Sequence, residues 1–282
     1  MVIVWGISWP AIKLGVASVP PLWYGCLRYL VAAGCLFAVV AARHELGVPS
    51  RSDWRLVGVS GGLQMGVYAA LTGLALTRLP AGRASVLAYS TPVWVVPLAA
   101  WRLGERLSRA ALAGVALGLA GAGVIAAPGL RAGRGEVLAY AMLLGAAAAW
   151  ATAIVYVRAH RFDATALALA PWQMLVAAVL LGPLALVVEG APPGIGPVGA
   201  ASLAYVGPVA TAFAYWAVVE TGRRFPASTL SMALLGTPAL GLLLSAVVLG
   251  EPVTASLLTG AVLIGAGIRA SGVPDGARTS SC

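Results

Sequence analysis

Charged side chains are scarce in this sequence. Only 10% of its 282 residues are Asp, Glu, Lys or Arg, whereas soluble domains carry about a quarter. Hydrophobic residues make up 60%, and the mean hydropathy is +0.93. The chain therefore has too little polar surface to cover a water-soluble globule of this length, and we expect lipid to surround most of it.

Acidic residues are absent from the middle of every long apolar stretch. The nearest, Glu220, lies towards one end of its stretch. Proton and sodium relays in membranes usually need a central carboxylate, so Glu220 is only a candidate proton site and the energy source stays unassigned. Membrane-embedded enzymes need carboxylate clusters, metal ligands or an activated serine. Because none of these occurs at membrane depth, we expect a protein that is not an enzyme.

Cysteine and histidine are also rare, with three and two residues in the chain. Cys26 and Cys35 are nine residues apart on one stretch, about 14 Å along a helix, which is beyond disulfide reach. His44 and His160 fall in loops, and no metal-ligand spacing is present. The sequence thus predicts no metal and no cofactor.

What the sequence does contain is ten apolar stretches, each of about the 20 residues that span a bilayer as a helix. The runs are continuous instead of alternating, which favours helices over a membrane β-barrel. We therefore predict an all-α integral membrane protein. The expected spans are 1–19, 21–41, 54–77, 81–101, 109–127, 136–157, 165–188, 198–219, 227–249 and 253–271.

One motif occurs twice. Thr91-Pro92 is followed by Gly104-Glu105, and 146 positions later Thr237-Pro238 is followed by Gly250-Glu251. A period this long is typical of the duplicated halves of membrane carriers. We expect five-helix repeats at 1–127 and 136–271, and a short polar tail at 272–282. Further equivalent pairs, at an offset of 145 or 146, are Ser85/Ser231, Gly114/Gly260, Gly121/Gly267, Trp5/Trp150, Lys13/Arg158 and Arg28/Gln173.

The basic residues beside the spans predict the orientation. If both termini are cytoplasmic, twelve arginines lie in cytoplasmic loops or the tail and four in outer loops, as the positive-inside rule requires. With an odd number of spans per half, the second half is inverted relative to the first. The net charge of +9 is spread over these loops and forms no basic patch interleaved with aromatic residues, so we expect no nucleic-acid partner.

The order and duplication of these motifs resemble the EamA-type drug/metabolite transporter superfamily. The matching residues are Trp5-Gly6, Lys13, Arg28 with the small residues that follow it, Pro92 and Gly104-Glu105. The resemblance implies ten helices in two inverted repeats around a central cavity. It also implies a carrier of small metabolites or drugs, with YddG-like exporters of aromatic and neutral amino acids as one kind. Gln173 departs from the pattern, because it stands where Arg28 would repeat.

Lys13 and Arg28 are the only basic residues well inside spans, seven residues on either side of the Pro20-Pro21 turn. Such charges usually face a cavity or a partner. We interpret one or both as attracting a substrate carboxylate or phosphate. The alternative is that both extend to the outer interface.

Aromatic and polar side chains at mid-span are the remaining candidates for lining a substrate path, because rings stack on flat or apolar cargo. The alternatives are ordinary packing for the rings and bonding to their own helix for Ser and Thr. The candidate substrate-binding residues, besides Lys13 and Arg28, are Trp5, Ser8, Trp9, Tyr68, Tyr89, Trp94, Trp150, Gln173 and Tyr215.

Prolines inside spans indicate where helices bend. We interpret Pro10, Pro92, Pro208 and Pro238 as gating or hinge positions, with the equivalent pair Pro92 and Pro238 bending their spans at the centre. Static kinks that only shape packing are the alternative.

Together these patterns predict a multi-pass protein of the bacterial inner membrane that exports neutral or zwitterionic amino acids by alternating access. The alternatives are a permease for drugs or sugar-phosphate-like solutes, a membrane-embedded enzyme, or an accessory subunit. Glycine stripes, such as Gly58, Gly62 and Gly66, predict close helix contacts within one chain or between two, so the oligomeric state stays open.

Overall fold

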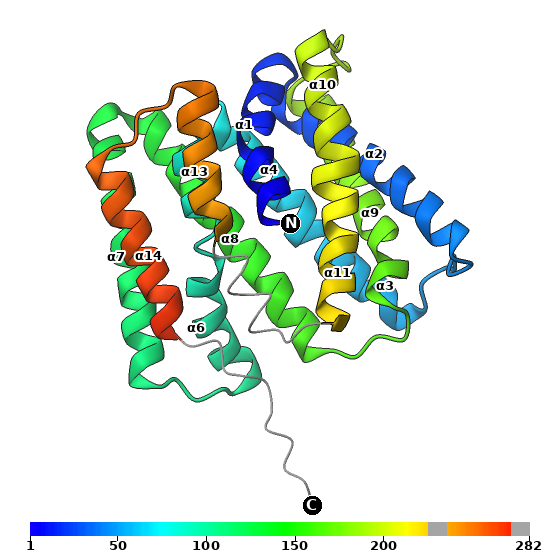
Figure 1. Ribbon diagram of the computed structural model, residues 1–282. Coiled ribbons are helices and arrows are strands. Elements are labelled where there is room, and N and C mark those ends of the chain that lie inside the picture. Colours follow the sequence, from blue (N-terminus) through cyan, green and yellow to red (C-terminus); the bar gives the residue numbers. More distant parts are fainter. Residues whose placement is uncertain (225–235, 272–282) are drawn as a thin grey trace, which may run out of the picture.

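The fold consists of helices joined by short loops (Figure 1). The computed structural model describes residues 1–224 and 236–271, and no residue in these ranges lies in a β-strand. Seven helical segments are long and apolar enough to cross a bilayer, and three shorter apolar helices bring the number in the described part of the chain to ten. The predicted ten-span, all-α fold is confirmed. The predicted tail 272–282 and the first part of the predicted span 227–249, with Ser231, lie outside the described residues.

The first half begins its helices where the sequence supplies caps. Ser50 and Asp53 form a reciprocal capping box at the start of α3, and the Ser108 side chain caps α7. The helices are α1 (Val2–Ser18), α2 (Pro21–Ala42), α3 (Arg51–Val59), the π-helix η1 (Ser60–Val67), α4 (Tyr68–Leu76), α5 (Ala81–Ala88), α6 (Thr91–Leu103) and α7 (Arg109–Ala132).

The second half repeats this order. Thr165 caps α9, and Pro197 occupies the first position of α10, where a missing N–H costs nothing. The helices are α8 (Arg134–Ala159), α9 (Ala166–Val188), α10 (Pro197–Tyr205), the π-helix η2 (Val206–Phe213), α11 (Ala214–Arg224), α13 (Gly236–Leu249) and α14 (Ala255–Ser271).

The repeated Gly-Glu pair ends the equivalent helices α6 and α13. Gly104 and Gly250 have φ angles of 69° and 65°, a left-handed conformation that glycine adopts without steric cost. Each glycine ends its helix, and the glutamate follows directly. This explains why both residues recur 146 positions apart.

The packing of the helices shows how the halves are related. The equivalent helices α7 and α14 pack against each other, as do α2 and α9 (Figure 1). Other contacts occur in exchanged pairs: α1 packs on α13 while α8 packs on α6, and α2 packs on η2 while α9 packs on η1. Such exchange is what a two-fold axis between equivalent halves produces. With five spans per half, the halves are inverted.

The same exchange holds for single glycines in the α7–α14 contact. A methyl group on Gly121 would lie 2.7 Å from the carbonyl oxygen of Gly260, and one on Gly267 would lie 2.5 Å from that of Gly114. Because Gly114 is equivalent to Gly260 and Gly121 to Gly267, the two contacts are images of each other. The backbones meet here as small residues allow in membranes.

Large apolar side chains cover the outside of the bundle. Val187 is 84% exposed and Val262 is 70% exposed, whereas many alanines lie in the interior. An apolar exterior of this extent is suited to lipid and not to water. We call outer the face that holds the turn between α1 and α2, following the predicted orientation.

Candidate functional site

The two π-helices mark the centre of each half. η1 (Ser60–Val67) and η2 (Val206–Phe213) lie at an offset of 146 at both ends. In η2 the Thr211 hydroxyl donates to the Val206 carbonyl, five residues back, over 2.7 Å. π-helices are rare and are frequent at functional sites, because the widened turn re-aims side chains and backbone groups. The sequence pattern did not predict these two segments.

Each π-helix touches one of the two equivalent positions that the sequence singled out. A methyl group on Gly61 of η1 would lie 2.5 Å from the backbone oxygen of Gln173, and one on Gly207 of η2 would lie 3.5 Å from that of Arg28. Gly61 and Gly207 are themselves equivalent. The inverted repeat therefore places Arg28 and Gln173 in matching positions against opposite π-helices.

Arg28 is a half-buried cation that forms no ion pair with any residue that the structure describes. Its Nε donates to the Thr211 hydroxyl over 2.9 Å, and its guanidinium carbon lies 4.9 Å from the centre of the Tyr29 ring. Among the residues that the structure describes, no carboxylate lies within ion-pair distance of Arg28. Its terminal nitrogens Nη1 and Nη2 are therefore open to an anionic ligand, which a guanidinium binds through two parallel hydrogen bonds.

An aromatic pair lies beside the π-helix η1. Tyr68 begins α4 directly after η1, and its ring meets that of Trp150 on α8 edge to face, with centres 4.5 Å apart. Tyr29, the residue after Arg28, donates its hydroxyl to the Met65 oxygen of η1, three residues before Tyr68. Arg28, Tyr68 and Trp150 thus combine a site for one negative charge with ring surface for an apolar group.

A second aromatic group lies at a break in the fourth span. α5 ends at Ala88 and α6 begins at Thr91, so Tyr89 and Ser90 lie outside both helices and Pro92 follows at the second position of α6. The fourth span is therefore interrupted just before Pro92. The Trp9 and Tyr89 ring centres are 6.4 Å apart.

Among the residues that the structure describes, two buried hydroxyl groups beside the Thr-Pro motifs have no hydrogen-bond partner. They belong to Ser90, which is 2% exposed, and to Thr237 at the start of α13, which is fully buried. Because the Thr-Pro motif places both near helix starts, the break offers polar atoms in an otherwise apolar interior.

Lys13 contacts different helices from Arg28. Its ammonium donates to the backbone oxygens of Leu76 and Leu79, at the end of α4. A cation there complements the negative end of the helix. The structure therefore gives Lys13 protein partners, whereas the terminal nitrogens of Arg28 have none in the described part of the chain.

The other predicted site residues make hydrogen bonds to the protein or lie within its helices. Trp5 donates its indole N–H to the Ala210 oxygen of η2 over 2.9 Å, and Ser8 donates to Trp5 of its own helix. Tyr215 donates to the Gln173 side chain over 3.1 Å. Trp94 is half-buried on α6. Of the predicted hinge prolines, Pro10 is buried within α1, Pro208 lies in η2 and Pro238 lies near the start of α13.

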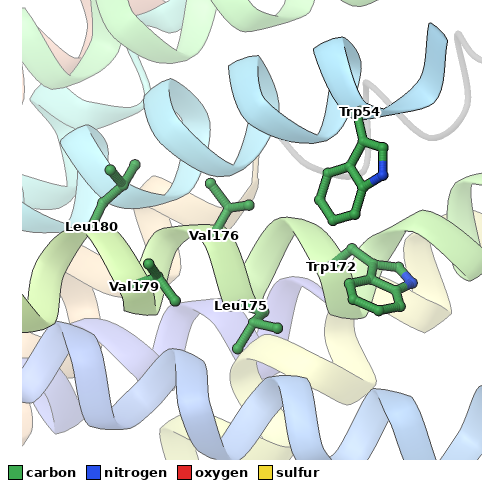
Figure 2. A pocket seen from close by; sticks show the side chains of 6 residues that line it. All are labelled: Trp54, Trp172, Leu175, Val176, Val179 and Leu180. Atoms are coloured by element: carbon green, nitrogen blue, oxygen red, sulfur yellow. The ribbon is translucent and has the colours of Figure 1, made fainter. Parts of the chain in front are cut away.

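An apolar groove of about 260 Å³ lies away from these residues, between α3 and α9. Figure 2 shows Trp54 of α3 facing Trp172 of α9, and the two ring centres are 5.5 Å apart. Val179 and Leu180, which also line it, are 61% and 53% exposed. The groove therefore opens at the periphery, and it contains none of the predicted site residues.

Comparison with known proteins agrees with this architecture. The sequence matches the EamA-like transporter family twice, over residues 1–127 and 137–272. It is 31% identical to a protein of Salmonella typhimurium called a probable amino-acid metabolite efflux pump, covering 95% of this chain and 91% of that protein. It is 33% identical to a probable terminal-alkyne amino-acid exporter of Streptantibioticus cattleyicolor, covering 95% and 89%.

A solved crystal structure has the same fold. It is 24% identical in sequence, and the alignment covers 95% of this chain and 94% of that chain with a TM-score of 0.62.

Proposed function

Because this chain belongs to the EamA-like transporter family, we propose that it exports neutral or zwitterionic amino acids, aromatic ones first, across the bacterial inner membrane. Two relatives whose names refer to amino-acid export match it over 95% of its length. Family and relatives support a membrane transporter, and the choice of substrate comes from the site.

The unpaired guanidinium of Arg28 is the observation that carries the substrate proposal. It is half-buried and has no carboxylate within ion-pair distance among the described residues. A single cation suits the single carboxylate of an amino acid, whereas a nucleotide sugar or sugar phosphate carries more negative charge and needs more cationic partners. Nη1 and Nη2 bind the two carboxylate oxygens in this proposal.

The Tyr68–Trp150 pair supplies the surface for the amino-acid side chain. Rings in this arrangement contact flat or apolar groups without a specific hydrogen bond. This favours aromatic and large apolar amino acids over small polar ones.

Transport proceeds by alternating access of the two inverted halves. The helix break at Tyr89–Ser90 beside Pro92 and the two π-helices each lie between helical segments, where hinge motion requires few backbone changes. The substrate is released to the outer side when the halves rock about these points.

Ligand-induced stabilisation of purified protein tests the substrate proposal. Phenylalanine is expected to raise the melting temperature in proportion to its occupancy, whereas its carboxamide, which lacks the negative charge, is not. Replacing Arg28→Gln removes the ion pair, which is worth about 2–5 kcal/mol when buried, and should abolish the shift.

Arg161→Gln is the matched control, because Arg161 is an exposed loop residue. It should keep the shift. Equal stabilisation by the acid and the amide, or an unchanged response in the Arg28 variant, would contradict carboxylate recognition at Arg28.

A further inference from the structure

Two opposite charges hold one helical hairpin at the outer face. The hairpin runs from the end of α4 through residues 77–80 to the start of α5. Lys13 of α1 donates to the backbone oxygens of Leu76 and Leu79 on one side of the turn. On the other side Glu251 accepts the backbone N–H groups of Ala81 and Gly82 over 2.7 and 2.9 Å.

Each charge fits the helix end that it contacts. The carbonyl end of α4 is negative and receives the cation, while the N–H end of α5 is positive and receives the anion. Both charged residues come from outside the hairpin: Lys13 lies on the first helix, and Glu251 follows α13 of the second half. The Glu251 contact therefore joins the two halves of the molecule.

The repeat equivalents of these residues lie at the opposite face, where the residues equivalent to Ala81 and Gly82 fall outside the described part of the chain. Glu105 is equivalent to Glu251, and Arg158 is equivalent to Lys13. There the Arg158 guanidinium and the Glu105 carboxylate form an ion pair with each other. Within the described residues, the pair of charges thus contacts a hairpin at the outer face and forms an ion pair at the inner face.

We propose that Lys13 and Glu251 form a charged latch that keeps the outer gate closed, and that Arg158 and Glu105 are its counterpart at the inner face. The inference rests on the alternating access proposed above. When the outer gate opens, the α4–α5 hairpin leaves, and Lys13 and Glu251 pair directly as Arg158 and Glu105 do here.

The exchange of partners avoids a large electrostatic penalty. A charge left unpaired in a low-dielectric region is costly, so a gate built from one charge would resist opening. In the closed arrangement Lys13 and Glu251 contact the two sides of the same short turn, at Leu79 and Ala81. Each state therefore leaves both charges compensated.

Glu189 provides a matched control on the same face. It accepts the N–H groups of Leu22 and Trp23 over 2.9 and 3.0 Å, which is the same cap on α2 that Glu251 makes on α5. The positions 146 and 145 residues before Glu189 hold Arg43 and His44, so no acid is repeated there. The charge pair of the latch is therefore not repeated there, and we expect Glu189 to be a fixed cap.

Thiol accessibility at Ser85 tests the latch. Ser85 is fully buried one turn below Gly82, and its hydroxyl lies 3.5 Å from the Pro238 oxygen of the other half. The protein is purified in nanodiscs with Ser85→Cys and with Cys35 and Cys282 replaced by alanine. The labelling rate of the introduced thiol by a polar maleimide, without substrate, then reports opening at this hairpin. Native Cys26, which is 5% exposed, reports global unfolding.

Glu251→Gln and, separately, Lys13→Gln are expected to raise the labelling rate about tenfold, the change that about 1.4 kcal/mol produces in a two-state equilibrium. Glu189→Gln should leave the rate unchanged, and Cys26 should stay protected. If Cys26 is labelled in the Glu251→Gln variant, that variant has unfolded, and the labelling rate of the Lys13→Gln variant tests the latch instead.

Equal rates in the parent and in both latch variants would overturn the latch, and so would an equal rise in the Glu189 variant. Because this measurement uses no substrate, it is independent of the Arg28 test. Failure of amino-acid recognition would leave the labelling result intact.

Discussion

At the scale of single residues, the structure shows different contacts for two basic side chains that have similar positions in the sequence. Lys13 and Arg28 are placed symmetrically about one turn, yet Lys13 binds the carbonyl end of α4, while Arg28 keeps Nη1 and Nη2 without partners among the described residues. Sequence alone shows that a charge lies at membrane depth. It does not show which backbone carbonyls tertiary packing brings to it. The partners of Glu251 and Glu189 were missed for the same reason.

Glycine packing at the α7–α14 contact gives a prediction at this scale. Gly121→Ala places a methyl group 2.7 Å from a backbone oxygen of Gly260, which the helices relieve only by moving apart. Overpacking of this kind costs about 1–3 kcal/mol, so the midpoint of thermal unfolding in detergent should fall. Gly123→Ala on the same helix meets open space and should leave the midpoint unchanged or raise it. Equal midpoints for the two variants would contradict close backbone packing at Gly121.

At the scale of elements, the spans are the most predictable part of this chain. The predicted stretch 165–188 is observed as α9 (Ala166–Val188), and 21–41 as α2 (Pro21–Ala42), because a continuous apolar run is long enough to define a membrane helix. The break beside Pro92 was also predictable, since proline removes a helical hydrogen bond.

The π-helices were not predictable from any one residue type. η2 contains Pro208, but the equivalent position in η1 is Gly62, so proline is not what the two segments share. They share close contacts with α9 and α2 at Gly61 and Gly207. These contacts depend on the assembled bundle and not on a local pattern.

The equivalent prolines Pro92 and Pro238 give a prediction about gating. Replacing both Pro92→Ala and Pro238→Ala restores helical N–H groups at equivalent points and should stiffen the two spans. We expect exchange between inward-open and outward-open states to slow by about tenfold or more, as the loss of a hinge raises the barrier. Distances between spin labels on the two halves, measured by double electron–electron resonance, together with transport rates, check this. Unchanged distance distributions and rates would mean that the kinks only shape packing.

At the scale of the whole molecule, the two halves form one inverted pair. Gly114 meets Gly267 as Gly121 meets Gly260, and α2 meets η2 as α9 meets η1. A molecule in which equivalent elements exchange contacts has two related ways to pack its halves.

Counterflow in liposomes tests the central claim most directly. Purified protein is reconstituted into vesicles loaded with unlabelled phenylalanine, and uptake of external labelled phenylalanine is followed over time. Transport by two alternating halves predicts uptake that is time-dependent, saturates with concentration and requires internal substrate. Folded protein that gives no uptake above empty vesicles, or only uptake that rises linearly without saturation, would contradict it.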